Sequence, residues 1–359
     1  MFLILAALTL FLVIVTLLPF LPFSHGIVRV GDFPRQQFFW LALVLLVLSV
    51  ALGDDATGWR VMQMALAGVI VIHARHILRY TPLWRKQTVD VGPAENGVPL
   101  RLVSANVKMG NDRYDEMRAE IARADPDIVV FMEVDAKWRN GLSALLDSYD
   151  HVIDQTRDNS YGMIVASKFP LGDLQVEELL TDGVPSAIAS VTVADGKVFR
   201  LYCIHPEPPV IHRGTEGRDG ETALVALKVK DEALPVIVTG DLNDVAWSMT
   251  TERFRTVSGL LDPRIGRRIF STFDARLPFL RWPLDHLFHS PEFRLVRMER
   301  LKPCGSDHFP VLFELMFCDD EKAHSEPDEP NGDDIRQARE VVSDARARTE
   351  DAIGTDWEK

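Results

Sequence analysis

Three long apolar segments in the first 80 residues constrain the fold of this chain more than any other feature. The first, Phe2–Phe23, is almost uninterruptedly apolar, and a helix of this length spans the roughly 30 Å hydrocarbon core of a bilayer. The segments Phe38–Leu52 and Val61–Ile77 follow after short polar loops. A cleaved signal peptide would show a basic start and a small-residue cleavage site, and the first segment has neither. We therefore predict a three-helix membrane anchor over residues 1–80.

The side of the membrane that carries the rest of the chain is less constrained. The first loop contains Arg29 and Arg35, the second loop contains only Arg60, and several basic residues flank the end of the third segment. By the positive-inside rule, the first loop and the C-terminal part of the chain would lie in the cytoplasm. Because the asymmetry is only a few charges, an external C-terminal part stays open.

After a Pro- and Gly-containing linker over residues 81–98, the sequence alternates between strand-like and helix-like segments up to residue 318. About ten strands and a few helices in a region of this size suit two packed sheets with helices outside. The acidic tail, residues 319–359, contains 14 acidic and 6 basic residues. Its composition predicts disorder, with at most a fraying helix over residues 334–352.

The charge distribution argues against a tight binder of extended duplex DNA. The chain carries a formal net charge of −13, whereas such binders usually present a basic patch. A local basic stretch could either contact phosphates or be a solvated loop. It comprises Arg264, Arg267, Arg268, Arg276 and Arg281.

Polar side chains follow several of the predicted strands at the point where each strand ends. Taken singly, such residues are commonly turn or cap residues. Together, at the ends of apolar strands, they indicate a site, since burying so many carboxylates without cations would be costly. The set comprises Asn106, Glu133, His205, Asp241, Asn243, Asp285, Asp307 and His308.

This ordered set resembles the endonuclease/exonuclease/phosphatase (DNase I-like) superfamily, and the resemblance covers about residues 100–315. The motifs that carry it include Val-Phe-Met-Glu133, Gly-Asp241-Leu-Asn243 and Ser-Asp307-His308. It implies an α/β fold, a four-layer sandwich of two mainly antiparallel sheets flanked by helices, with residues 99–318 as the catalytic domain. The segment after Gly240, with the anchor upstream, is also similar to the bacterial membrane-anchored branch. That implies a multi-pass protein of the bacterial inner membrane with an external catalytic domain.

The resemblance also implies a metal site. Glu133 would be the principal ligand of Mg²⁺, with Asn106 and Asp307 nearby and Mn²⁺ as an alternative metal. Mg²⁺ prefers oxygen ligands and keeps several waters, so one or two carboxylates and a substrate phosphate suffice.

The remaining site residues carry implied roles in activating water. His308 would be the general base, oriented by Asp285 or by its neighbour Asp307, since a histidine pKa near 6.5 suits this work at neutral pH. Asp241 would orient or deprotonate the water, and Asn243 would donate to a phosphoryl oxygen. His205 would hydrogen-bond the phosphate.

Together these features predict a Mg²⁺-dependent phosphoric ester hydrolase that cleaves a phosphodiester by in-line attack of an activated water. The substrate would be a nucleic acid or a lipid head group; nucleic acid is compatible with the sequence but not required, and the bilayer favours a lipid. The alternatives are a phosphomonoesterase of the same fold and a catalytically inactive, membrane-tethered scaffold. The complete residue set disfavours the scaffold. The sequence indicates no protein partner.

Overall fold

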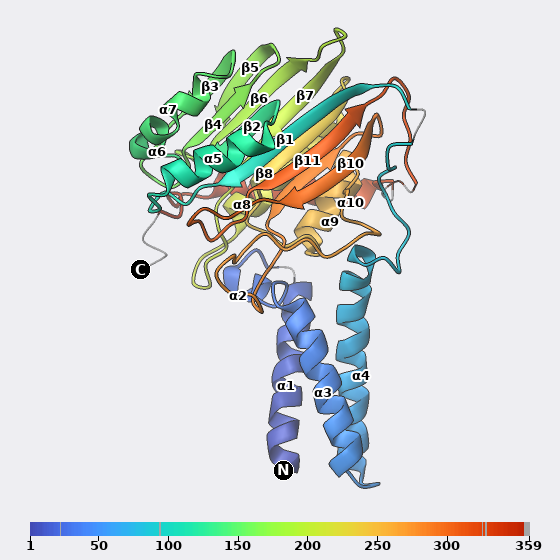
Figure 1. Cartoon of the computed structure of the whole chain (residues 1–359). Coiled ribbons are helices and arrows are strands. Elements are labelled where there is room, and N and C mark those ends of the chain that lie inside the picture. Colours follow the sequence, from blue (N-terminus) through green and yellow to red (C-terminus); the bar gives the residue numbers. More distant parts are fainter. Residues whose placement is uncertain (22, 93–94, 325, 327–328, 355–359) are drawn as a thin grey trace.

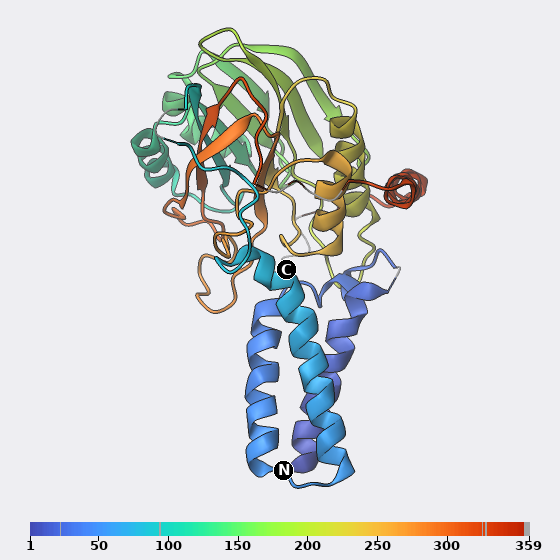
Figure 2. The same cartoon turned by 90° about the vertical axis from the view of Figure 1, so that its right-hand side faces the viewer.

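Three N-terminal helices form a bundle that stands beneath a larger α/β domain (Figures 1 and 2). The structure is a computed structural model, and it describes residues 1–21, 23–92, 95–324, 326 and 329–354. Within these residues, α1 (Phe2–Leu17), α3 (Arg35–Leu52) and α4 (Thr57–Ile77) are long and apolar enough to cross a membrane. Leu12, Leu45 and Leu66 pack between the helices, while many other apolar side chains of the bundle point outward.

The bundle meets the α/β domain at two places. The chain between α1 and α3 contains the short helix α2 (Gly26–Arg29) and lies against the domain, as does the end of α4, which continues as a 3₁₀ turn (Leu78–Tyr80). The N-terminus and the turn between α3 and α4 lie at the opposite end of the bundle. The Tyr80 hydroxyl donates to the Ala246 carbonyl, and the Gly266 amide donates to the Arg79 carbonyl at 2.8 Å.

The α/β domain contains two sheets. The first has the strand order β10-β11-β1-β2-β4-β3, and the second has the order β5-β6-β7-β8-β9. The pairs β1–β2 and β7–β8 are parallel, and the other neighbours are antiparallel. The strands are β1 Val98–Asn106, β2 Ile128–Met132, β3 His151–Gln155, β4 Met163–Ser167, β5 Leu171–Glu178, β6 Pro185–Thr192, β7 Val198–Cys203, β8 Val236–Asp241, β9 Asp285–His289, β10 Phe293–Arg300 and β11 Val311–Phe317.

Alternation along the strands divides the apolar side chains between the two faces of each sheet. Leu100 and Leu102 of β1 point toward the second sheet, whereas Val103 and Ala105 point toward the helices outside the first sheet. Helices α5 (Tyr114–Ala124), α6 (Ala136–Gly141) and α7 (Ser143–Leu146) lie on the first sheet. Helices α8 (Glu216–Lys230) and α9 (Met249–Ser258) lie on the second sheet, and α10 (Gly332–Ala347) packs on the outside of these two helices. The predicted four-layer sandwich is confirmed.

Two strands were not predicted from the sequence, β3 and β5. Each lies at the edge of its sheet. Most side chains of β5 are exposed, so its sequence lacks the apolar alternation that marks a half-buried strand.

The acidic tail differs from its predicted disorder over Gly332–Ala347, which form α10. Asn331 caps the helix, because its side chain accepts from the Asp333 and Asp334 amides at 2.8 and 3.0 Å. Three small or apolar side chains of α10 are buried against α8 and α9: Ala338, Val342 and Ala345. Figure 2 shows α10 end on, outside these helices. A single apolar stripe is thus enough to order a helix that is otherwise highly charged.

The basic stretch divides into structural and cavity-facing arginines. Arg264 is fully buried and forms an ion pair with Asp262 at 2.8 Å, so it is neither a solvated residue nor a phosphate contact. Arg267 donates to the Thr88 carbonyl at 2.8 Å, and Arg268 donates to the Met298 carbonyl at 2.7 Å. Arg276, in contrast, lines a cavity at the edge of the sandwich, described below.

We predict that Val342→Asp releases α10 from the domain. A carboxylate in the α8–α10 interface would cost roughly 2–4 kcal/mol, because it is buried without a partner. Limited trypsin digestion should then cleave α10 rapidly. Ser343→Asp adds the same charge at the neighbouring exposed position and should leave cleavage slow. Equal, fast cleavage of the wild type and both variants would show that α10 does not dock.

We predict a pH-dependent contribution from the Asp262–Arg264 pair. Burial alone would raise the pKa of Asp262, but Arg264 outweighs this effect and holds the pKa below 3.8. The pair therefore stabilises the fold above pH 3.8, and this stabilisation is lost as the pH falls through the folded-state pKa.

Asp262→Asn should lower the thermal unfolding midpoint by several degrees at pH 7, since breaking a buried pair costs about 3–5 kcal/mol. The gap to the wild type should narrow as the pH approaches 3. The exposed control Asp147→Asn should change little at either pH. A gap of equal size at pH 3 and pH 7 would contradict the pairing.

Candidate active site

Strand topology brings the predicted site residues to one edge of the sandwich. Because β1 and β2 are parallel, Asn106 and Glu133 emerge at the same end of the first sheet. In the second sheet, β7 and β8 are also parallel, so His205 and Asp241 emerge together. The antiparallel strand β9 begins where β8 ends, which places Asp285 opposite Asp241.

The backbone at this edge adopts left-handed conformations at several positions. Glu133 has a φ of 62°, directly after β2, and Asn243 has a φ of 52°. Gly240 has a φ of 145°, and a Cβ there would lie 1.9 Å from the Ile204 carbonyl oxygen, so only glycine fits before Asp241. Positive φ angles at non-glycine residues are a frequent feature of functional sites.

Asn106 connects the two sheets across the site. Its amide group donates to Glu133 Oε1 at 2.7 Å and to Asp241 Oδ2 at 3.1 Å. Glu133 Oε2 also accepts from the Met109 amide at 3.1 Å. These hydrogen bonds hold the carboxylates of Glu133 and Asp241, one from each sheet, at fixed positions relative to each other.

His308 lies between two carboxylates of the second sheet. Its Nδ1 is 2.9 Å from Asp285 Oδ2, and its Nε2 is 3.4 Å from Asp241 Oδ2. His205 approaches the same Asp241 oxygen with its Nε2 at 4.0 Å. Of the two aspartates that the sequence offered as partners, Asp285 is the one hydrogen-bonded to His308.

Burial and neighbouring charges shift the pKa values of these groups in different directions. Burial raises the pKa of Glu133 to about 7 and lowers that of His205 to about 4. Burial also raises the pKa of Asp241. For His308, burial disfavours the charged form, but Asp285 and Asp241 outweigh it and raise the pKa to about 10. His308 is therefore protonated at neutral pH, which differs from the near-neutral value expected from the sequence.

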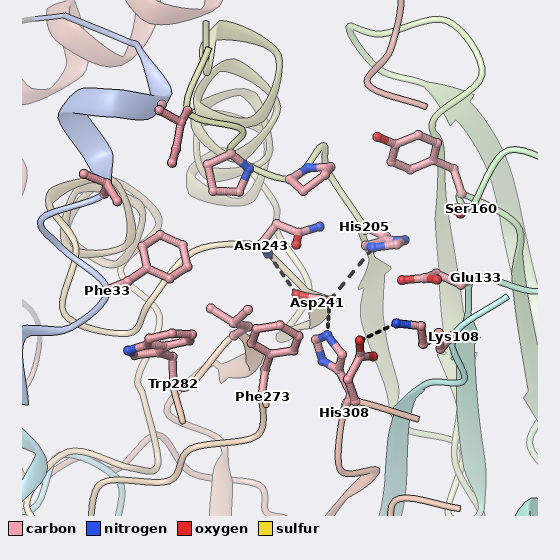
Figure 3. Close-up of a pocket in the computed structure, with 18 of the residues that line it drawn as sticks. Phe33, Lys108, Glu133, Ser160, His205, Asp241, Asn243, Phe273, Trp282 and His308 are labelled. Atoms are coloured by element: carbon pink, nitrogen blue, oxygen red, sulfur yellow. Dashed lines mark hydrogen bonds and ion pairs between the residues drawn. The ribbon is translucent and has the colours of Figure 1, made fainter. Parts of the chain in front are cut away.

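A cavity of about 650 Å³ opens at this edge of the sandwich, within the size range of small-molecule sites (Figure 3). Asn106 and Asp285 do not line the cavity and instead contact residues that do. The predicted site residues that line it are Glu133, His205, Asp241, Asn243, Asp307 and His308.

Two cationic side chains in the cavity were not assigned to the site from the sequence. Lys108 Nζ is 2.7 Å from Asp307 Oδ2, and the Arg276 guanidinium is 3.3 Å from the same oxygen. Arg276 belongs to the basic stretch that could contact phosphates. Lys108 lies two residues beyond β1, and this proximity to Asn106 is the signal that could have identified it.

The cavity wall also includes residues of the segment between α1 and α3: Gly26, Val30, Phe33 and Pro34. No sequence pattern links this segment to strand ends more than 70 residues away. Figure 3 shows Phe33 across the cavity from Glu133 and Lys108, with Phe273 and Trp282 on the same side as Phe33.

Two groups of residues are candidates for a metal site. Asp241, Asp285 and His308 place ligand atoms within 4.8 Å of one another, but they are hydrogen-bonded or ion-paired among themselves. Glu133 faces the cavity, and burial raises the pKa of its carboxyl group to about 7. The second oxygen of Asp285 and Nδ1 of His205 are also buried without a hydrogen-bond partner among the described residues. The carboxylate oxygens of Glu133 and Asp307 and the amide oxygen of Asn106 are of the ligand type that fits Mg²⁺.

Comparisons with known proteins agree with the fold. No curated protein sequence matches the chain. A Bacteroides thetaiotaomicron endonuclease/exonuclease/phosphatase family protein is 21% identical, with a TM-score of 0.52, over 63% of this chain and 100% of its own. D. rerio TDP2 complexed with single strand DNA product is 18% identical, with a TM-score of 0.51, over 60% of this chain and 98% of its own. The human Nocturnin catalytic domain with bound sulfate is 16% identical, with a TM-score of 0.51, over 65% of this chain and 97% of its own.

These structural comparisons establish the fold alone, because the sequence identities are only 16–21%. The sequence itself matches the model of the Endonuclease/Exonuclease/phosphatase family over residues 103–308. This match includes the segments from β1 through His308 that supply all eight predicted site residues, and it extends over more than half of the chain. The chain therefore belongs to the endonuclease/exonuclease/phosphatase family.

Proposed function

We propose that this protein is a Mg²⁺-dependent hydrolase of phosphodiesters. The observation that carries the proposal is the cavity in which the carboxylates of Glu133, Asp241 and Asp307 lie beside a protonated His308. Family membership supports a phosphoesterase, since the family's name covers nucleases and phosphatases. The proposed catalytic domain remains residues 99–318, joined by the linker 81–98 to a membrane anchor over residues 1–80.

The metal is proposed to bind beside Glu133, with Asn106 and Asp307 as the other two ligands. Asp307 already contacts Lys108 and Arg276, so its charge is partly balanced without a metal. Bound at Glu133, Mg²⁺ would neutralise charge that develops on the phosphoryl group and assist departure of the leaving oxygen.

The pKa values support a division of roles between Asp241 and His308. The raised pKa of Asp241 makes its carboxylate a better proton acceptor, which suits it to orient and deprotonate the attacking water. His308, held protonated by Asp285, would donate to a phosphoryl oxygen instead of acting as the general base.

Two further side chains would support the phosphoryl group. His205 is neutral at pH 7, because its pKa is lowered to about 4, and it can donate one hydrogen bond. Asn243 donates to the Pro206 carbonyl at 2.9 Å, which fixes its amide beside the cavity and leaves a second N–H for substrate.

Two alternatives use the same fold. A phosphomonoesterase would need cations for a doubly charged group, and the cavity side chains Lys108 and Arg276 both contact Asp307. This pairing favours a singly charged diester. An inactive scaffold would tolerate loss of the charged cluster, whereas here all eight predicted residues lie in or directly behind the cavity.

We predict that Glu133→Ala, Asp241→Ala and His308→Ala each lower kcat/KM for ethyl 4-nitrophenyl phosphate by about 10²–10⁴-fold, measured with the full chain in detergent. Each change removes a group that faces the reacting phosphate or water. The matched control is Glu116→Ala, an exposed carboxylate on α5, which should retain wild-type turnover. Full activity in all three cavity variants would refute the site assignment.

We predict that EDTA abolishes turnover of the same ester by the wild type and that excess Mg²⁺ restores it. Glu133→Gln keeps the shape of the side chain but removes its charge. This change should raise the Mg²⁺ concentration for half-maximal rate on the order of tenfold or more. Turnover that persists after exhaustive EDTA treatment would show that the hydrolysis does not need a metal.

A further inference from the structure

The segment between α1 and α3 is fastened to the α/β domain by polar contacts at both ends. The Gly26 amide donates to the Arg213 carbonyl at 2.9 Å, and a Cβ at Gly26 would lie 1.9 Å from the Val210 carbonyl oxygen. Farther along, Trp247 Nε1 donates to the Asp32 carbonyl at 2.7 Å. The wall that Val30, Phe33 and Pro34 add to the cavity is therefore a fixed part of the site.

A continuous row of aromatic rings runs from this segment to the proposed catalytic centre (Figure 3). The ring centroids of Phe33 and Trp282 are 5.9 Å apart, those of Trp282 and Phe273 are 6.2 Å apart, and those of Phe273 and His308 are 4.8 Å apart. One end of the cavity is thus charged, and the other is apolar and begins where the helical bundle begins.

The loops around the apolar end expose large apolar side chains. Phe279 is 90% exposed, Ile211 is 59% exposed and Val30 is 38% exposed. Gln37, in the first turn of α3, donates to the Phe279 carbonyl at 3.0 Å, so this loop lies level with the top of a helix long enough to cross a membrane. Figure 1 shows loops of the α/β domain reaching the top of the bundle beside α2. A bilayer that surrounds the bundle would cover these side chains.

We propose that the substrate is a phosphodiester lipid of the same bilayer, whose hydrocarbon chain lies along the apolar wall while its phosphate reaches Glu133, Asp241 and His308. The inference rests on the proposed hydrolysis of phosphodiesters and adds the class of substrate. The occupant of the apolar wall is hydrocarbon because the wall is continuous with the surface of the bundle, and a membrane lipid supplies both hydrocarbon and phosphate at that position.

A single-stranded nucleic acid fits the same cavity less well. Stacking platforms for bases are accompanied by a positively charged groove that follows the backbone. In this cavity, Lys108 and Arg276 both contact Asp307, and the chain carries a net charge of −13.

The test compares two diesters with the same leaving group, ethyl 4-nitrophenyl phosphate and hexadecyl 4-nitrophenyl phosphate. Both are offered with Mg²⁺ to the full chain reconstituted in phosphatidylcholine vesicles, and a single-stranded oligonucleotide is a third substrate. We expect the wild type to cleave the hexadecyl ester on the order of tenfold faster or more.

The decisive quantity is the ratio of hexadecyl to ethyl turnover in variants of the apolar wall. Val30→Asp and Ile211→Asp each place a charge on an exposed side chain of that wall and should lower this ratio on the order of tenfold. Partitioning of each ester into the vesicles is common to all variants and cancels in the comparison. Leu83→Asp is the matched control, since Leu83 is 85% exposed and lies outside the cavity, and it should keep the wild-type ratio.

The outcomes separate this inference from the proposed function. Turnover of the ethyl ester with no preference for the hexadecyl ester, or a ratio that both cavity variants leave unchanged, overturns the lipid substrate and leaves phosphodiester hydrolysis standing. Faster cleavage of the oligonucleotide than of the hexadecyl ester also overturns it. Absence of turnover of every ester by the wild type overturns the proposed function and the inference together.

Discussion

The structure of this protein depends on compensating the negative charge of the carboxylates that its two sheets bring together at one edge. Parallel pairing of β1 with β2 and antiparallel pairing of β8 with β9 force Glu133, Asp241 and Asp285 into a common region. Their proximity is tolerable because Asn106 donates to Glu133 and Asp241, and His308 lies between Asp241 and Asp285. A group that carries positive charge is therefore required by the fold as well as by the chemistry.

The N-terminal helical bundle contributes to the same site through the segment between α1 and α3. Asp219, at the start of α8, accepts from Arg29 of α2 at 3.1 Å and from Arg218 at 2.7 and 2.9 Å. Arg218 in turn donates to the Asn243 carbonyl at 3.0 Å. The position of the loop that carries Asn243 is thus coupled to the top of the helical bundle, and the apolar wall of the cavity exists only when the segment between α1 and α3 is docked.

The sequence predicted the sandwich and six of the polar residues that line the cavity, because apolar strands that end in polar residues leave a strong local pattern; it did not assign Lys108 or Arg276 to the site. It did not predict α10 as a docked helix, since Ala338, Val342 and Ala345 are diluted among charged residues. It also missed the contribution of Val30 and Phe33, because nothing local to an apolar loop shows which distant surface will cover it. The charge on His308 could not be predicted either, as it depends on which aspartate lies nearest in space.

The proposed hydrolysis requires that a water molecule activated in this cavity attacks phosphorus. Hydrolysis of ethyl 4-nitrophenyl phosphate in ¹⁸O-labelled water, followed by mass spectrometry of both products, tests it most directly. The account predicts that the label enters ethyl phosphate and that 4-nitrophenol remains unlabelled. Label in 4-nitrophenol, or no hydrolysis above the rate in buffer, would contradict it.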